Sequence, residues 1–225
     1  MKINNAKIMS ASDFNPCIIV PIYNHGELFK KCLPEILVHN IPLIIIDDGS
    51  DSRTQKILQK IISENPQITL FSLDTNQGKG AAVLCGFEIA AQKGFTNAMQ
   101  IDADDQHSFS DIPLFLNLAK TNPNCVINGT PIYDYSVPKF RLYGRKITNF
   151  WVSLETLSLD IKDAMCGFRV YPIDSVIKIC GKNMAKGMAK GMGFDTEIIV
   201  RLYWQGLGIV NQPTKVKYPV SGISH

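Results

Sequence analysis

The chain contains 225 residues, of which 45% are hydrophobic and 19% charged, and it carries a formal net charge of +3. This composition is that of a globular protein with enough apolar residues for a packed core, and it excludes an extended disordered tract. No apolar run approaches the roughly 20 residues that a membrane-spanning helix needs, and the first residues lack the apolar core of a signal peptide. We therefore expect a cytoplasmic protein that is soluble or, at most, peripheral on a membrane surface.

The charges are unevenly distributed along the chain. Residues 1–112 contain nine Lys and Arg against thirteen Asp and Glu, a net charge of −4, whereas residues 113–225 contain fourteen against seven, a net charge of +7. The basic second half suits an anionic acceptor or a membrane surface, although solvated lysines are the simpler interpretation of any single residue. No stripe of basic and aromatic residues indicates nucleic-acid binding.

Six cysteines are scattered through the chain without a Cys-x-x-Cys pair. Several of them lie in apolar surroundings. This pattern favours reduced, buried thiols in a cytosolic protein over disulfides or a zinc site.

Apolar runs alternate with helix-like segments through the first 130 residues. The expected strands are 17–22, 43–47, 68–73, a run that ends at 102, and 125–128. The expected helices between them cover about 28–32, 52–62 and 81–92, and Pro34 makes the second half of the first helix uncertain. This alternation predicts an α/β fold with a mostly parallel sheet and helices on both faces.

The second half of the chain is less regular. Residues 130–139 contain two prolines and several aromatic or apolar residues, and we expect an acceptor-shaping loop there. A helix is expected over about 142–157. Residues 184–193 form a short imperfect repeat of methionine, lysine and glycine, which favours a flexible surface loop, with contact to a membrane or lipid as the alternative.

Polar side chains follow three of the predicted strands. Tyr23, Asp48 and the pair Asp102 and Asp104 all come just past a strand end. Because ligands of α/β proteins collect beyond the carboxyl ends of strands, these residues should share one crevice. Carboxylates at i and i+2 are hard oxygen ligands that suit Mg²⁺ or Mn²⁺ and leave positions for water and a phosphate. An acidic turn is the alternative.

Two further motifs carry weaker signals. Asp47 and Asp48 are adjacent carboxylates that repel one another unless one accepts hydrogen bonds from a ribose, a base or backbone amides. Simple helix capping by residues 50–51 explains the same segment. Lys79, within residues 76–80, could approach a diphosphate, although the segment lacks the P-loop pattern and a structural turn explains it equally well.

The motifs together resemble family 2 glycosyltransferases. Residues 20–24, 46–50, 76–82 and 102–107 occur in the order and spacing of that family, and residues 163–169 resemble its Asp-x-x-x-Gly-Phe-Arg segment. The chain looks most like the dolichyl-phosphate mannose synthase branch, which includes bacterial polyprenyl-phosphate glycosyltransferases, from about residue 17 to 219. The resemblance implies a GT-A fold, a nucleotide-sugar donor such as a UDP- or GDP-sugar, a divalent metal (Mg²⁺ or Mn²⁺), and inversion at the anomeric carbon.

The same resemblance implies roles for individual residues. Pro21, Tyr23 and Asp48 would line the nucleoside pocket with Asp47 beside them, Lys79 would lie near the nucleotide, and Asp102, Asp104 and Gln106 would hold the metal. Asp105 is expected to be a solvated neighbour and His107 a structural group.

Asp163 matches the position of the family's catalytic carboxylate. It would act as a base towards a hydroxyl acceptor, but only as an orienting group towards an anionic lipid phosphate. A salt bridge to Arg169 or another basic residue is the alternative. Arg145 and Arg169, together with Arg141, are candidates for gripping a phosphate of the donor or acceptor.

Some positions depart from the family pattern. His25 replaces a common acidic residue, which leaves the donor base open, and residues 129–131 lack the Gly-x-Arg of many relatives. Glu197 is not followed by Gln-x-x-Arg-Trp, so the resemblance does not extend to processive cellulose- or chitin-making enzymes.

We therefore predict one domain over 1–225, with a nucleotide-sugar-binding half (about 15–129) and an acceptor-binding half (about 130–225). It would transfer a single sugar to a lipid-linked acceptor, a polyprenyl phosphate or a glycolipid, on the inner face of a membrane. A second copy of the chain is a further candidate partner. The alternatives are a sugar-phosphate nucleotidyltransferase, whose glycine-rich N-terminal loop is missing, and a non-catalytic nucleotide-binding module, which the retained Asp102, Asp104, Asp163 and Lys79 argue against.

Overall fold

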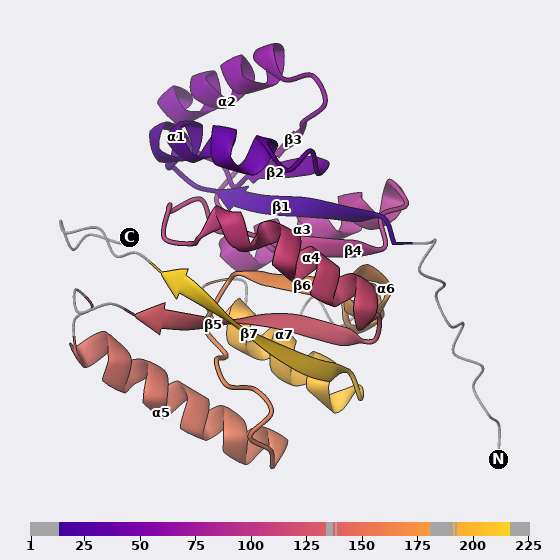
Figure 1. The fold of residues 1–225 in the computed structure, drawn as a ribbon. Helices are drawn as coiled ribbons and strands as arrows, with labels where there is room; N and C mark the ends of the chain where they lie inside the picture. The colour runs from indigo at the N-terminus through magenta and orange to yellow at the C-terminus, as the bar shows by residue number, and fades with distance from the viewer. Residues whose placement is uncertain (1–13, 134–136, 138, 181–190, 192, 217–225) are drawn as a thin grey trace.

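A computed structural model describes residues 14–133, 137, 139–180, 191 and 193–216 (Figure 1). Its elements in chain order are β1 (Pro16–Ile22), α1 (Gly26–Leu37), β2 (Leu43–Asp47), α2 (Ser52–Glu64), β3 (Thr69–Ser72), α3 (Lys79–Gln92), β4 (Asn97–Gln100), η2 (Phe109–Asp111), α4 (Ile112–Thr121), β5 (Cys125–Tyr133), α5 (Lys139–Thr156), β6 (Arg169–Pro172), α6 (Ile173–Ile179), α7 (Phe194–Trp204) and β7 (Gly208–Val216).

The strands form one seven-stranded sheet in the order β3-β2-β1-β4-β6-β5-β7. β1 pairs in parallel with β2 and β4, and β5 pairs in parallel with β7. β6 runs antiparallel to both of its neighbours, β4 and β5. The prediction of a mostly parallel sheet is confirmed, but the reversal at β6 was not predicted.

Helices cover both faces of the sheet, as predicted (Figure 1). Along β1, Ile18 and Val20 pack in one cluster with side chains of α1, α2 and α4, whereas Cys17 and Ile19 pack in another with side chains of α3, α6 and α7. A strand with two buried faces needs apolar residues at every position, which explains the continuous apolar run of β1.

Three differences between the predicted and the observed element boundaries concern α1, β4 and β5. α1 continues through Pro34 to Leu37 because Phe29, Cys32 and Ile36 form one buried face, and the amide of Val38 still bonds to the Pro34 carbonyl. β4 ends at Gln100 rather than at 102. β5 extends to Tyr133, across part of the predicted 130–139 loop, because β7 pairs with it along its whole length.

Further sequence predictions concern the 184–193 repeat, membrane-spanning helices and the cysteines. The 184–193 repeat falls almost entirely outside the described residues. Among the helices that the structure describes, none is long and apolar enough to cross a membrane. All six cysteines are free thiols, and the prediction of burial is confirmed for four of them, whereas Cys85 and Cys125 are only partly buried.

Candidate active site

The candidate site lies at the sheet edge where β1, β2 and β4 end and where the antiparallel β6 begins. Gln100, the last residue of β4, pairs with Arg169, the first residue of β6. The segment before β6 therefore reaches the same edge as the segment after β4. A cavity of about 640 Å³ opens there, and it is lined by Pro21, Ile22, Tyr23, Asn24, His25, Asp48, Asn76, Lys79, Asp102, Ala103 and Asp104. The structure thus brings together six of the predicted site residues from four separate segments of the chain.

The turn after β2 is tied to the loop before α3. Both carboxylate oxygens of Asp48 accept backbone amides from that loop, those of Gln77 at 2.7 Å and Gly78 at 2.9 Å. Gly49 has φ +68, and a Cβ there would collide with the backbone of residues 75–76. Asp48 therefore shapes the cavity wall as well as lining it.

Asp47 has a different environment from its neighbour. Its side chain is fully buried, and its Oδ1 accepts the backbone amide of Ser50 at 3.0 Å. It does not belong to the set of residues that line the cavity. Asp51 caps α2 by accepting the amide of Thr54 at 2.7 Å, as the capping interpretation of this segment predicted.

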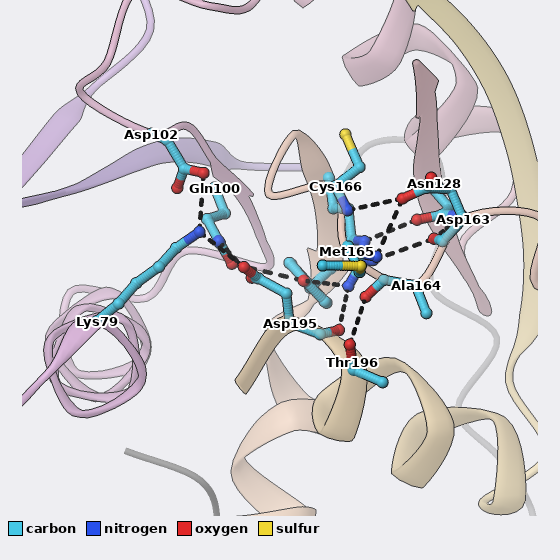
Figure 2. A network of polar contacts seen from close by, with 12 residues as sticks. Lys79, Gln100, Asp102, Asn128, Asp163, Ala164, Met165, Cys166, Asp195 and Thr196 are labelled. Carbon is cyan, nitrogen blue, oxygen red and sulfur yellow. Dashed lines mark hydrogen bonds and ion pairs between the residues drawn. The ribbon is translucent and has the colours of Figure 1, made fainter. Parts of the chain in front are cut away.

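Lys79 opens α3 and bridges two carboxylates (Figure 2). Its Nζ lies 2.8 Å from Asp102 Oδ2 and 2.7 Å from Asp195 Oδ2. Burial disfavours the ammonium, but the two carboxylates outweigh it and raise the pKa of Lys79 above its ordinary value. Gln100 Nε2 holds the second oxygen of Asp195 at 2.8 Å.

Asp102 and Asp104 have the features of a cation site. Asp102 Oδ1 is buried without a hydrogen-bond partner, which is costly unless a ligand contacts it. Burial and the neighbouring Asp102 both raise the pKa of Asp104. A divalent cation would contact the unpartnered Asp102 oxygen and reduce the repulsion between the two carboxylates. Its remaining coordination positions suit water and phosphate oxygens. Among the described residues, no group of three or more His, Cys, Asp or Glu side chains lies close enough together to hold a metal ion.

Gly167 brings the segment before β6 into contact with Asp102. A Cβ at this position would overlap the Asp102 carboxylate. Only glycine therefore fits there while Asp102 keeps its position. This close approach explains why glycine occupies position 167 of the Asp-x-x-x-Gly-Phe-Arg segment.

Asp163 is paired with Arg145 rather than with Arg169. Arg145 Nη2 donates to Asp163 Oδ1 at 2.9 Å, and Arg145 Nε donates to Oδ2. The backbone amides of Met165 and Cys166 also donate to Asp163 Oδ1, at 3.0 and 2.8 Å. The carboxylate is buried and lies outside the set that lines the cavity. Both of its oxygens are therefore engaged by hydrogen-bond donors of the protein.

The position of the Arg169 side chain contradicts the prediction that Arg169 binds a phosphate. Its side chain is fully buried, with Nε donating to Asn128 Oδ1 at 2.7 Å and Nη2 donating to the Asp163 carbonyl at 3.2 Å. Nη1 donates to the Asp195 carbonyl, so Arg169 instead joins the two segments that carry Asp163 and Asp195.

Two other predicted site residues, Gln106 and Arg141, are not seen to line the cavity. Gln106 is buried and is not among the described residues that line the cavity. The side chain of Arg141 lies outside the described part of the structure.

Sequence reasoning missed the role of Asp195 and Gln100. Asp195 lies in the first turn of α7, where an acidic residue is explained by the helix dipole alone. Gln100 is a fully buried polar residue at the end of a buried strand, and that contrast was the available signal.

Comparison with known proteins gives one family match. Residues 17–179 match the model of the family described as Glycosyl transferase family 2. An undecaprenyl-phosphate mannosyltransferase of Micrococcus luteus is 24% identical over 209 residues, which cover 87% of this chain and 80% of that protein. A polyprenol monophosphomannose synthase of Mycolicibacterium smegmatis is 25% identical over 217 residues, covering 92% and 79%.

Solved structures share the fold. A mannosyltransferase from Pyrobaculum calidifontis, in complex with GDP-Man and Mn²⁺, superposes with a TM-score of 0.63 at 15% identity. The match covers 92% of this chain but only 58% of that one. The predicted GT-A fold is thereby confirmed.

Proposed function

The chain belongs to glycosyl transferase family 2, and on that premise we propose that it transfers one sugar from a nucleotide sugar to a polyprenyl phosphate with inversion. The observation that carries this proposal is the meeting of Asp48, Lys79, Asp102 and Asp104 around one cavity at the carboxyl ends of the strands. Both curated relatives described above carry an undecaprenyl-phosphate or polyprenol substrate in their names, which supports the acceptor class.

Asp102 and Asp104 would hold Mg²⁺ or Mn²⁺, because the buried Asp102 Oδ1 is unpartnered and the two carboxylates repel one another. When bound, the cation neutralises the charge that develops on the leaving nucleoside diphosphate. Lys79 already contacts Asp102 and supplies a second positive charge at the same place.

The donor nucleoside would lie against Pro21, Tyr23 and Asp48. Tyr23 is half-exposed at the cavity, so its ring is available to a base or ribose. Both Asp48 oxygens already accept backbone amides, and carboxylate oxygens have lone pairs left for a further donor. A cavity of about 640 Å³ is in the range of small-molecule sites.

The acceptor would need no general base. A phosphate oxygen is anionic at neutral pH, so it can bond to the anomeric carbon as the bond from that carbon to the nucleoside diphosphate breaks. Asp163 then serves to hold Arg145, whose guanidinium is the group suited to bind the acceptor phosphate. This assignment selects the orienting role of Asp163 over the catalytic-base role.

The test is a transfer assay with a matched pair of variants. Asp104→Asn removes one proposed ligand charge, whereas Asp105→Asn alters an exposed neighbour with φ +57, a conformation that asparagine tolerates. We expect Asp104→Asn to lose Mn²⁺ binding, measured by calorimetry, together with sugar transfer to a short-chain polyprenyl phosphate. Asp105→Asn should retain both. Equal Mn²⁺ binding by the two variants would contradict the metal assignment.

A thermal-shift panel identifies the donor base. UDP, GDP, CDP and dTDP are each added with and without Mn²⁺, and the nucleotide that binds raises the unfolding temperature because it stabilises the native state. We expect the shift to require the metal and to disappear after chelation. Nucleotide binding without transfer to any polyprenyl phosphate would favour the non-catalytic module instead.

A further inference from the structure

One face of α5 exposes large apolar side chains to solvent. They are 46% to 71% exposed and comprise Phe140, Tyr143, Ile147, Phe150, Trp151 and Leu154. Leu157, directly after the helix, is 90% exposed. Their spacing of three and four residues places them along one side of the helix, which we call the α5 apolar face. Single exposed apolar residues are normal, but a contiguous patch of this kind marks an interaction surface.

The opposite side of α5 faces the protein. Val152 packs with Ile199 and Val200 of α7, and Arg145 forms the ion pair with Asp163. A helix that served only to cover the core would turn its aromatic residues inward. α5 does the reverse, and in Figure 1 it lies at the outer margin of the molecule, beside α7 and away from the sheet. Its apolar face therefore has no covering element among the described residues.

The sequence of α5 has the charge that suits an anionic surface. The first two turns of α5 contain Lys139, Arg141, Arg145 and Lys146 and no acidic residue, and Glu155 is the one acidic residue of the helix sequence. A basic helix with an apolar stripe is the pattern of segments that lie in the interface of anionic bilayers. Tyrosine and tryptophan are also the residues enriched at that depth.

We infer that the α5 apolar face inserts into the headgroup region of an anionic bilayer and seats the enzyme on the membrane. The inference rests on the proposed function, because a polyprenyl-phosphate acceptor resides in a bilayer. A helix is about 10–12 Å across, so the Arg145–Asp163 pair on the inner side of α5 would lie about one helix diameter from the lipid. The acceptor phosphate could then reach Arg145 while its chain stays in the membrane.

A second copy of the chain is the other partner that could cover the α5 apolar face. Apolar residues at 140, 143, 147, 150 and 154 follow the alternation of three and four that pairs helices in coiled coils. Such seams favour aliphatic residues, however, whereas aromatic residues dominate the α5 apolar face. Together with the basic sequence of the first two turns of α5, this composition favours the bilayer.

The experiment measures flotation of the full chain with vesicles of phosphatidylcholine alone or mixed with phosphatidylglycerol. The test variant combines Phe150→Glu and Trp151→Glu. The control combines Phe71→Glu and Leu114→Glu, which are also exposed but lie on β3 and α4. We expect the wild type and the control to bind only the anionic vesicles, with weakening at high salt. The test variant should bind more than about tenfold less, a loss of about 1.4 kcal/mol.

Other outcomes overturn the inference. Unchanged vesicle binding by the test variant, or no binding by the wild type, would remove the membrane assignment. A dimer of the wild type that the same variant dissociates, without vesicle binding, would assign the face to a second copy. Transfer to a water-soluble, short-chain polyprenyl phosphate without vesicles tests the proposed function separately, and the test variant should retain it.

Discussion

The buried carboxylate of Asp195 and the partly buried carboxylate of Asp102 hold the Lys79 ammonium between them. Their charges keep the lysine protonated despite its burial, and Lys79 in turn holds the pKa of Asp102 below its ordinary value against the effect of burial. The three groups therefore depend on one another. Removing any one charge leaves the others buried and incompletely paired.

Asp195→Asn is expected to destabilise the fold. Asparagine keeps the shape but removes the negative charge, so the buried Lys79 keeps only Asp102 as a counter-ion. We expect a loss of about 1–3 kcal/mol in the free energy of unfolding, measured by urea denaturation. Glu64→Gln is the control, because it breaks the exposed pair with Lys60 and should change that free energy by less than about 0.5 kcal/mol. Equal stability of both variants would contradict the network.

Gly167→Ala is expected to impair the proposed metal site. The added Cβ would overlap the Asp102 carboxylate and displace it. Changes next to a metal ligand commonly weaken metal binding by about 10- to 100-fold, and we expect a loss of that size in Mn²⁺ affinity by calorimetry.

Gly144→Ala is the matched control for this substitution. It adds the same methyl group on α5, where no atom lies within 4 Å of the new Cβ. Mn²⁺ affinity should not change in this variant. If Gly167→Ala also leaves the affinity intact, Asp102 is not positioned by this contact.

The direction of β6 and the length of α1 could not be predicted from the sequences of these two elements. β6 has four residues and runs antiparallel to both neighbours, so the segment before it arrives at the edge where β4 ends. A parallel β6 would have sent Gly167 and Asp163 to the opposite edge. α1 gives a second example, since its buried apolar face maintains the helix through Pro34.

Pro34→Ala is expected to stabilise the protein. Pro34 is exposed in the interior of α1, where proline lacks an amide to donate and costs about 3 kcal/mol relative to alanine. The greater flexibility of the unfolded variant offsets about 0.4–1 kcal/mol of that gain. We therefore expect the free energy of unfolding in urea to rise by about 2–2.6 kcal/mol.

Glu35→Ala at the adjacent exposed position is the control, with an expected change within about 0.5 kcal/mol. A lower stability of Pro34→Ala than of the wild type would mean that the proline ring makes a contact that the helix needs.

The molecule as a whole buries four of its six thiols, two on each side of the sheet. Cys32 and Cys166 belong to the core cluster on one side, and Cys17 and Cys180 belong to the cluster on the other. Burial raises the pKa of Cys17 and Cys166 to about 12. Because only the thiolate is reactive, a raised pKa makes each thiol less reactive at any given pH.

Alkylation with iodoacetamide at pH 8 should therefore distinguish the cysteines. In the native protein, we expect Cys17 and Cys166 to stay unmodified, because the pH lies well below the pKa of about 12 and both are buried. Cys85 and Cys125, which are only partly buried, should react first. All six should react once urea unfolds the chain, as followed by mass spectrometry of the peptides. Rapid native labelling of Cys17 would contradict the buried position of β1.

Much of the fold and part of the candidate site were predictable from the sequence. The buried strands and the amphipathic helices follow from the local period of apolar residues, and the carboxyl ends of parallel strands meet at one edge by geometry. That is why Tyr23, Asp48, Asp102 and Asp104 were expected together, whereas Lys79 was placed near the nucleotide by the family resemblance; all five line one cavity. Arg169 was misassigned because a guanidinium suits buried carbonyls as well as phosphates.

The sequence by itself determined the α/β architecture, the family and the acidic edge, because each depends on patterns within a few tens of residues. Only the tertiary structure decided the partners of the charged groups. Lys79 and Asp195 are 116 residues apart, and Arg145 reaches Asp163 from a different element. Such pairs form because burial requires each charge to find an opposite one, and which one it finds depends on how the sheet and helices close around it.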